Sequence, residues 1–554
     1  MDRMVKVTFK NKIVKEFLVS TTLEEVSHSF KNNFNYPILI AKVDNNLAHL
    51  GKTITKKCDI DFYDRSSIVG NTVYASSVQL MLIVAIKRVL GRSTDVMIEH
   101  SIDKGIYCEL INREITKEEL NKVEKEMFNL VKEDLSFTRV SVARIDAIKY
   151  FKKEKQMDKV RVLKYISNSY VTLYRLDDVY DYFFGEMAYS TKDIDDFKLT
   201  YINEKGFVLA YPNIYNPECT LDYVHHKLIF DKFLDYTNWG KAIGIETAAD
   251  LNEVVSRGKY NEVIRLAEAH YESQLAEISE VINERKGTVK LVLLAGPSSS
   301  GKTTTAKKLA VYLQSKGFRT HSISIDDYFY DRKDTPKKEN GDYDFESIKA
   351  IDMDLFNKQL NKLLEGEKVL LPEYNFVLGK KEYKKHFQIK EKDIIIIEGL
   401  HALNDELTMA IEDKYKYKIY ISPLTQLNVD NHNRIHTSDT RRLRRIIRDN
   451  KYRGTMASET LKMWKDIREG EEKYIFPYQD SADIVINTAL VYELGILKTY
   501  AEPLLFSVPE DDEVYPEALR LINFLRNFLP IPSDEVPRDS ILREFIGGSG
   551  FYDN

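Results

Sequence analysis

The stretch Gly296-Pro-Ser-Ser-Ser-Gly-Lys-Thr-Thr-Thr305 decides the fold of the second half of the chain. It follows a short aliphatic run at residues 289–295, which predicts a buried strand, and it precedes residues 306–314, whose apolar side chains recur at helical spacing. The order strand, G-x-x-x-x-G-K-[ST], helix is typical of a phosphate-binding loop. The glycines let backbone N–H groups turn toward an anion, and the helix N-terminus adds positive potential.

This loop predicts contacts to a nucleoside triphosphate and to a metal ion. Lys302 would reach the β- and γ-phosphates, and the Thr303 hydroxyl would take one position around Mg²⁺. We therefore expect ATP as the bound nucleotide, held by Gly296, Ser298, Ser299, Ser300, Gly301, Lys302, Thr303 and Thr304.

Size and composition limit the remaining possibilities. A chain of 554 residues exceeds what one hydrophobic core holds, so three or four domains are expected. The net charge of −5 gives no overall attraction to nucleic acid or anionic membrane. Cys58, Cys108 and Cys219 match no metal or disulfide spacing, which favours a reduced, cytoplasmic setting. We find no signal core at the start and no apolar run of about eighteen residues, so membrane insertion is not expected.

Strands and helices alternate from residue 289 to about residue 505. This pattern predicts an α/β fold, a doubly wound parallel sheet with helices on both faces and ligands at the carboxyl ends of the strands. Acidic residues stand at those ends: Asp326 and Asp327 follow the run at 320–325, and Glu398 ends the apolar run at 393–398. A buried carboxylate needs a cation, so Glu398 is expected opposite Thr303 at Mg²⁺. Asp326 has two candidate roles, as a magnesium ligand or as the base for an attacking hydroxyl.

A row of arginines follows farther along the chain. Arg441, Arg444, Arg445 and Arg448 lie at i, i+3, i+4 and i+7, so a helix would place them on one face. Three interpretations stay open: a lid over the transferring phosphate, a nucleic-acid contact, or a solvated basic face. The lid is favoured beside a phosphate-binding loop, where an arginine contributes roughly 10³–10⁵ in rate. Asp449 is expected to hold one of these arginines.

The motifs GPSSSGKTTT, IDDYF, YDFES (343–347), PEYNF (372–376), IIIIEGL, RRLRRIIRD and RG occur in the order that resembles the uridine kinase and phosphoribulokinase family. The resemblance covers about residues 289–500. It implies a nucleoside kinase that transfers the γ-phosphate of ATP, with Mg²⁺, to the 5′-hydroxyl of uridine or a related ribonucleoside. It also implies the following roles: Asp326 as general base, Lys302, Arg441 and Arg445 as catalytic cations, Thr303 and Glu398 at the metal, Phe345 and Glu346 at the sugar, and Tyr374 and Phe376 at the base.

One departure leaves the substrate open. Uridine kinases often carry a histidine after the P-x-Y-x-F segment, and this chain has Leu378-Gly379-Lys380-Lys381 there. A sugar-phosphate kinase is therefore an alternative, with basic residues near the pocket to hold the substrate phosphate. A regulator that senses tRNA through the other half of the chain is a second alternative. The candidate basic residues are Lys380, Lys381, Lys384 and Lys385.

The first half resembles the N-terminal half of threonyl-tRNA synthetase. Residues 1–64 predict strands at 5–9, 13–19, 38–43 and 59–63 and a helix start at Thr21-Thr22, which favours a β-grasp module like the synthetase's TGS module. Helices are expected at 78–90, 115–130 and 141–153, with the motif D-K-G-I-Y (103–107) between the first two, as in the editing domain.

The departures from the editing domain indicate that its hydrolase is lost. Its H-x-x-x-H and C-x-x-x-H positions fall on Ser76 and Leu80, and near Phe183 and Met187. These side chains cannot replace a polar metal-binding site. We expect this half to keep the fold and to serve in RNA binding, regulation or dimer formation, or only as a structural appendage.

The chain is thus expected to divide into a TGS-like module (1–66), a degenerate editing-like domain (67–212), a helical connector (213–288), a kinase domain (289–505) and a helical tail (506–554). A homo-oligomer contact through the tail stays open. Its last residues, after the Gly547-Gly-Ser-Gly550 stretch, are expected to be mobile.

Overall fold

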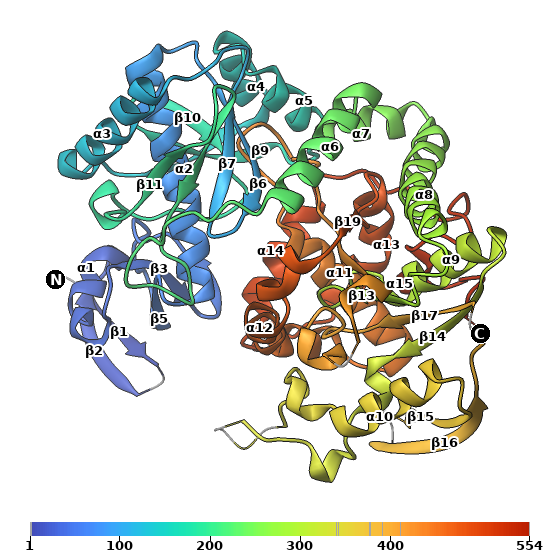
Figure 1. The fold of residues 1–554 in the computed structure, drawn as a ribbon. Helices are drawn as coiled ribbons and strands as arrows, with labels where there is room; N and C mark the ends of the chain where they lie inside the picture. The colour runs from blue at the N-terminus through green and yellow to red at the C-terminus, as the bar shows by residue number, and fades with distance from the viewer. Residues whose placement is uncertain are drawn as a thin grey trace. The chain divides into compact units, whose positions relative to one another are not determined.

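The computed structural model describes residues 3–10, 12–338, 341, 343–375, 378–390, 392–409 and 411–552, without the side chains of residues 384 and 385 (Figure 1). The chain forms two compact units, each assembled from separate stretches. The first comprises Met1–Arg257, Gln426–His436 and Glu502–Pro530. The second comprises Gly258–Thr425, Thr437–Ala501 and Ile531–Asn554. The sequence predicts no such interleaving, because it divides the chain only along its length.

The first unit begins with a small mixed sheet. Its strands lie in the order β2-β1-β5-β3-β4, with β1 parallel to β5 and the other pairs antiparallel. Thr22 caps α1 through a capping box with Glu25, as the sequence predicts. The elements are β1 (Met4–Phe9), β2 (Ile13–Leu18), α1 (Leu23–His28), β3 (Ile38–Val43), β4 (Asn46–Ala48) and β5 (Cys58–Asp64).

A second module follows in the same unit, with strand orders β11-β12-β7-β6 and β10-β9-β8. The prediction of a helix over 141–153 is wrong at its start, because residues 141–143 end β8 and only then does α4 begin. The elements are α2 (Ile68–Leu90), β6 (Val96–Ile102), β7 (Gly105–Leu110), α3 (Lys117–Glu133), β8 (Thr138–Ala143), α4 (Arg144–Lys153), α5 (Met157–Lys164), β9 (Tyr170–Leu176), β10 (Val179–Tyr182), β11 (Lys198–Tyr201), β12 (Gly206–Ala210), α6 (Lys227–Ile243), α7 (Ala248–Ser256) and α14 (Tyr515–Leu525).

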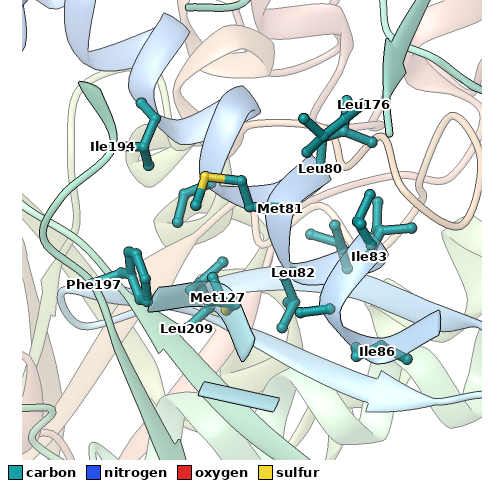
Figure 2. Packing of buried hydrophobic residues seen from close by; sticks show 14 of the residues in the cluster. Leu80, Met81, Leu82, Ile83, Ile86, Met127, Leu176, Ile194, Phe197 and Leu209 are labelled. Carbon is teal, nitrogen blue, oxygen red and sulfur yellow. The ribbon is translucent and has the colours of Figure 1, made fainter. Parts of the chain in front are cut away.

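The helix α2 forms the centre of this module's core. Figure 2 shows Leu80, Met81 and Ile83 of α2 among side chains from α3 and the surrounding strands. By length and composition α2 could cross a membrane, although the sequence shows no unbroken apolar run. However, 72% of its most apolar stretch is buried inside the protein, as expected for the core helix of a folded domain.

Three of the four positions that the resemblance assigns to the synthetase's editing site carry apolar side chains, and the fourth, Ser76, is half-buried. Leu80 and Met187 are fully buried and Phe183 is nearly so, and all three belong to the core around α2. A packed hydrocarbon core has no room for a water nucleophile or a metal ion. The packing around these three side chains is consistent with the predicted loss of the polar site, which stays a prediction.

A short segment between two elements of the second unit folds into the first. Residues Gln426–His436 contribute Asp430 and His432 to a cluster of buried charges. Lys159 Nζ lies 2.7 Å from Asp181 Oδ1 and 3.1 Å from Asp430 Oδ1. His432 contacts Asp181 through Nδ1 at 2.6 Å and Asp95 through Nε2 at 2.8 Å. Opposite charges balance each other here, as buried ionic groups require.

The second unit holds the parallel sheet that the sequence predicts. Its strands lie in the order β14-β17-β13-β18-β19, and every neighbouring pair is parallel. The elements are α8 (Tyr260–Glu284), β13 (Leu291–Ala295), α9 (Lys302–Ser315), β14 (Arg319–Ser324), α10 (Met353–Leu364), the hairpin β15 (Val369–Asn375) and β16 (Lys380–Phe387), β17 (Asp393–Glu398), β18 (Lys416–Ser422), α11 (Thr437–Arg453), α12 (Ala457–Tyr474), β19 (Ile484–Asn487), α13 (Glu493–Phe506) and α15 (Arg543–Ile546).

The described part of the tail makes defined hydrogen bonds, and the last two residues, 553–554, on which the expected mobility also falls, lie outside the described residues. Lys307 of α9 donates from Nζ to the carbonyl oxygen of Phe551 at 2.9 Å. The amide of Gly550 donates to the carbonyl oxygen of Arg538 at 2.7 Å. Hydrogen bonds to a helix and within the tail hold this segment, which composition alone does not reveal.

The buried charge cluster generates a pH prediction. Asp181 and Asp95 raise the pKa of His432 to about 9, against the opposing effects of burial and Lys159 and above the ordinary value of 6.5. Because the folded state binds the proton more tightly, the stabilisation is fully present below about pH 6.5 and is lost as the pH rises through about 9. We expect the free energy of unfolding of the first unit to fall by on the order of 2–3 kcal/mol over this window.

Urea unfolding at pH 6.5 and pH 9.5, followed by circular dichroism, measures this difference. The variant His432→Gln should lose most of the pH dependence, whereas His225→Gln, at an exposed position, should keep it. An unchanged slope in His432→Gln would contradict the assignment.

Candidate active site

The loop between β13 and α9 has the curled backbone that its glycines predict. A Cβ atom added at Gly296 would lie 2.2 Å from the carbonyl oxygen of Ile421, so only glycine fits beside β18. Gly301 has φ = 86°, in the left-handed region that favours glycine. The helix α9 begins at the next residue, Lys302, and directs its free N–H groups toward the loop.

The loop carries donors that suit phosphate oxygens. Lys302 Nζ donates to the carbonyl oxygens of Gly296 at 3.0 Å and Pro297 at 3.1 Å. The hydroxyl oxygens of Ser299 and Ser300 are buried and have no hydrogen-bond partner within the described residues. Buried polar atoms of this kind are normally satisfied, so their exception indicates a ligand-binding position. The residues therefore fit the phosphate groups of a nucleotide.

Thr303 and Glu398 meet at the edge of the sheet, as the sequence predicts. Thr303 Oγ1 donates to Glu398 Oε1 at 3.3 Å, because β13 and β17 are parallel neighbours. Burial and the nearby charge of Asp326 together raise the pKa of Glu398 to about 7. Oxygen atoms are the ligands that Mg²⁺ prefers. In the described part of the chain no group of three or more His, Cys, Asp and Glu side chains could hold a metal ion, so phosphates and water would complete the coordination.

Asp326 lies just past the end of β14, in the turn Ile325–Tyr328. Burial raises the pKa of its carboxyl group, while the positive charges of Lys302, Arg453 and Arg448 act in the opposite direction. The carboxylate thus faces the cations of the phosphate-binding loop and of α11. This position allows either of the two roles predicted for Asp326.

The arginines of α11 converge on the phosphate-binding loop, as their spacing indicates. Arg441 Nε donates to the carbonyl oxygen of Ser298 at 2.8 Å, and Arg445 Nη1 donates to the Ser298 hydroxyl at 2.5 Å. Arg444 Nη1 approaches the carbonyl oxygen of Ser299 at 3.5 Å. One face of α11 therefore covers one side of the loop.

The same arginines differ in burial, which a common lid does not predict. Arg441 and Arg444 are 2% and 0% exposed and form ion pairs with Glu471 and Glu493. Each of these two arginines is paired with a buried glutamate, so its guanidinium group is better placed to hold the loop than to close over a ligand. Arg441 contacts the loop at Ser298 in this structure, and its predicted role in a lid stays a prediction.

A second group of arginines gathers around one carboxylate. Asp449 lies 3.1 Å from Arg445 Nε, 3.0 Å from Arg448 Nη2 and 3.4 Å from Arg453 Nη1. Arg448 and Arg453 also act on Asp326. Burial lowers the pKa of Arg445 to about 10, which leaves it charged at neutral pH. The three guanidinium groups supply positive charge beside the loop.

The residues expected at the substrate gather around Phe329. Its ring lies 6.4 Å from Phe345 and 5.9 Å from Tyr374, both edge-on. Phe345 is 38% exposed, whereas Tyr374 is buried. Burial and Glu471 raise the pKa of Glu346 to about 7, against the opposing charge of Arg445. Phe376, expected in the base pocket, lies outside the described residues.

Two further groups of residues hold the loop and were not predicted from the sequence. The amide of Ser298 donates to Glu471 Oε1 at 3.0 Å, and Glu471 is also the ion-pair partner of Arg441. Glu471 stands in the ordinary helical stretch REGEEKY (468–474), where no motif marks it. Glu544 and Tyr552 of the tail likewise contact the loop helix through Thr304, at 2.6 and 3.1 Å.

Comparison with known proteins agrees with this geometry. Residues 291–493 match the sequence model of the family described as Phosphoribulokinase / Uridine kinase family. A uridine kinase of Anoxybacillus flavithermus is 29% identical over 194 residues, which are 35% of this chain and 83% of that protein. The second half of the chain is therefore similar to P-loop kinases of this family, and the resemblance predicted from the motifs is confirmed.

The first half matches a different group of proteins. A threonine–tRNA ligase of Desulforamulus reducens is 28% identical over 198 residues, or 35% of this chain. The chain spans only 31% of the length of that ligase and 40% of the length of the one from Finegoldia magna.

A solved structure described as "Structure of a Possible Uridine Kinase from Bacillus stearothermophilus" aligns with a TM-score of 0.27 at 20% identity, covering 39% of this chain and 98% of that one.

The contact between Glu471 and the loop leads to a stability prediction. Glu471→Gln removes the charge that compensates the buried Arg441, and breaking a buried ion pair in this way costs about 3–5 kcal/mol. Urea unfolding of the second unit should report this loss. Glu469→Gln, on the same helix but exposed to solvent, serves as the matched control and should change stability by less than about 1 kcal/mol.

Proposed function

We propose that the protein is an ATP-dependent, Mg²⁺-requiring kinase that phosphorylates the 5′-hydroxyl of uridine or a related ribonucleoside. The observation that carries this proposal is the meeting of four groups at the carboxyl edge of one parallel sheet. Thr303 and Glu398 are in hydrogen-bond contact there, and Asp326 faces Lys302. The family match over residues 291–493 supports a phosphotransferase, and the choice of substrate is our inference.

The mechanism assigns one task to each group. Lys302 and the hydroxyls of Ser299 and Ser300 bind the phosphates of ATP. Mg²⁺, when bound at Thr303 and Glu398, neutralises charge on those phosphates. Asp326 accepts the proton of the attacking hydroxyl as its oxygen bonds to the γ-phosphorus and the bond to the leaving ADP breaks. Burial raises the pKa of Asp326, which makes it a stronger base than an exposed aspartate.

The charges on the substrate side favour an acceptor without a phosphate group. Asp326, Asp327 and Glu346 are acidic, and Glu346 is suited to accept hydrogen bonds from sugar hydroxyls. Lys381, a candidate for a substrate phosphate, is instead paired with Asp352 at 2.6 Å. These contacts support a neutral sugar or nucleoside over a sugar phosphate.

For the first half of the chain we propose a binding or regulatory role toward RNA, without hydrolysis. Its similarity to threonine–tRNA ligases supports an RNA contact. The side chains of Leu80, Phe183 and Met187 are apolar and buried in the core, so none of the three can activate water.

A panel of free nucleosides and sugar phosphates, incubated with ATP and Mg²⁺ and scored by product mass, tests the proposal. A nucleoside 5′-monophosphate is the expected product. A phosphorylated sugar phosphate would assign the enzyme to the alternative substrate class. ATP consumption that depends only on added tRNA would replace the kinase with a regulator.

Lys302→Ala should abolish turnover and leave the fold intact, because the side chain that neutralises the β- and γ-phosphates is lost. Product formation and circular dichroism measure the two effects. Lys358→Ala, at an exposed position of α10, is the matched control. A Lys302 variant that retained most of the activity would contradict the assignment of the loop.

Asp326→Asn should lower kcat by roughly 10²–10⁴ with little change in ATP affinity, because it removes the base and keeps the shape of the side chain. Asp354→Asn, which alters an exposed carboxylate, should leave kcat unchanged. A collapse of Mg²⁺-dependent ATP binding in Asp326→Asn would show instead that this residue is mainly a metal ligand.

A further inference from the structure

The C-terminal segment is built firmly into the second unit. Arg543 of α15 donates from Nη2 to the carbonyl oxygens of Ser533 at 2.8 Å and Val536 at 2.7 Å. Ser540 is fully buried and donates from Oγ to Glu268 Oε1 at 2.5 Å. These contacts fix the position of the residues that follow.

That segment covers the end of the phosphate-binding loop. The Thr304 hydroxyl donates to Glu544 Oε2 at 2.6 Å and lies 3.1 Å from the Tyr552 hydroxyl, and Thr304 is 0% exposed. A Cβ atom at Gly301 would lie 2.3 Å from Ile541 Cδ1, so the tail touches the loop backbone itself. A residue expected to contact the nucleotide is therefore occupied by the protein's own tail.

Two lysines extend this contact beyond the loop. Lys307 of α9 places its ammonium group 3.9 Å from the centre of the Tyr552 ring. Lys451 of α11, the helix that bears the arginines, donates from Nζ to the carbonyl oxygen of Ile546 at 3.0 Å. The tail is thus bound to α9 and to α11, both of which carry residues of the site.

The charge of the tail opposes a bound nucleotide. Glu544 adds a third carboxylate to the field at Lys302, beside Glu398 and Asp326. A triphosphate brings further negative charge to the same loop, and like charges at short range repel each other. The Thr304 hydroxyl has one proton to donate, so it cannot serve Glu544 and a phosphate oxygen together.

We propose that residues 541–552 are an internal competitor of the nucleotide, with the Glu544 carboxylate occupying a phosphate-oxygen position at Thr304. This inference rests on the proposed function, since it requires a nucleoside triphosphate at the loop. Nucleotide binding then displaces Glu544 from Thr304 and frees residues 547–552, while the buried side chains of Ile541 and Phe545 stay in place. The displaced contacts lower the apparent affinity for ATP. The segment thereby inhibits the binding of ATP to the proposed kinase.

Calorimetric titration of the full-length protein with a non-hydrolysable ATP analogue and Mg²⁺ tests this inference. Glu544→Gln should bind the analogue with a Kd about tenfold lower than the original protein. A chain that ends at Gly548, without Phe551 and Tyr552, should show a change in the same direction. Glu535→Gln removes an exposed charge from the same segment and should leave the Kd unchanged.

Hydrogen exchange provides a second readout that does not depend on variants. The amides of Gly547 and Gly550 donate to the carbonyl oxygens of Arg543 at 2.9 Å and Arg538 at 2.7 Å. Their exchange should become faster when the analogue binds. Slower exchange of these amides, or a higher Kd of Glu544→Gln for the analogue, would overturn the inference. Either result would show that the tail helps to bind the nucleotide.

The two proposals fail in different ways. If the original protein binds the analogue and Glu544→Gln has the same Kd, the internal competitor is refuted while the kinase assignment stands. If neither protein binds any nucleotide, the proposed function is refuted, and the competitor with it.

Discussion

The second unit depends on how one residue of the phosphate-binding loop is held between two helices. The amide of Ser298 donates to Glu471 of α12, and its carbonyl oxygen accepts from Arg441 of α11. The two side chains also form an ion pair with each other, buried away from water. Two hydrogen bonds therefore hold the peptide units on either side of Ser298, and the ion pair links the two side chains that form them, so a loop meant to bind an anion is shaped before the anion arrives. This preorganisation lowers the cost of ordering the loop on binding.

The two halves of the chain treat their polar centres in opposite ways. In the kinase-like half, acids and cations remain at the carboxyl edge of the sheet, with perturbed pKa values at Asp326, Glu346 and Glu398. Perturbed titration of this kind is typical of functional sites. In the synthetase-like half, Leu80, Phe183 and Met187, three of the positions that the resemblance assigns to a polar site, belong to the core around α2. Such a core needs only apolar side chains of suitable volume.

Much of this could be predicted from the sequence, because local chemistry determined it. The loop motif, the apolar runs of β13 and β17 and the capping box at Thr22 each carry their own physical reason. The meeting of Thr303 with Glu398 followed from the parallel order of the strands. Glu471 and Glu544 could not be predicted, because each acts through a contact far away in the sequence and neither stands in a motif. The burial of Arg441 was missed for the same reason. Helical spacing predicts which residues share a face of a helix, but it does not predict which other elements pack against that face.

The excursion of residues 426–436 determines how the chain can be divided. A fragment that began at the first strand of the kinase-like sheet would carry this segment without the rest of its unit. Asp430 and His432 would then lose Lys159, Asp181 and Asp95, and two groups that are now wholly buried would face water or each other. The kinase-like region therefore cannot be separated from the first half without losing these buried contacts. Any recombination that exchanged it for a relative's would have to carry matching residues on both sides of the join.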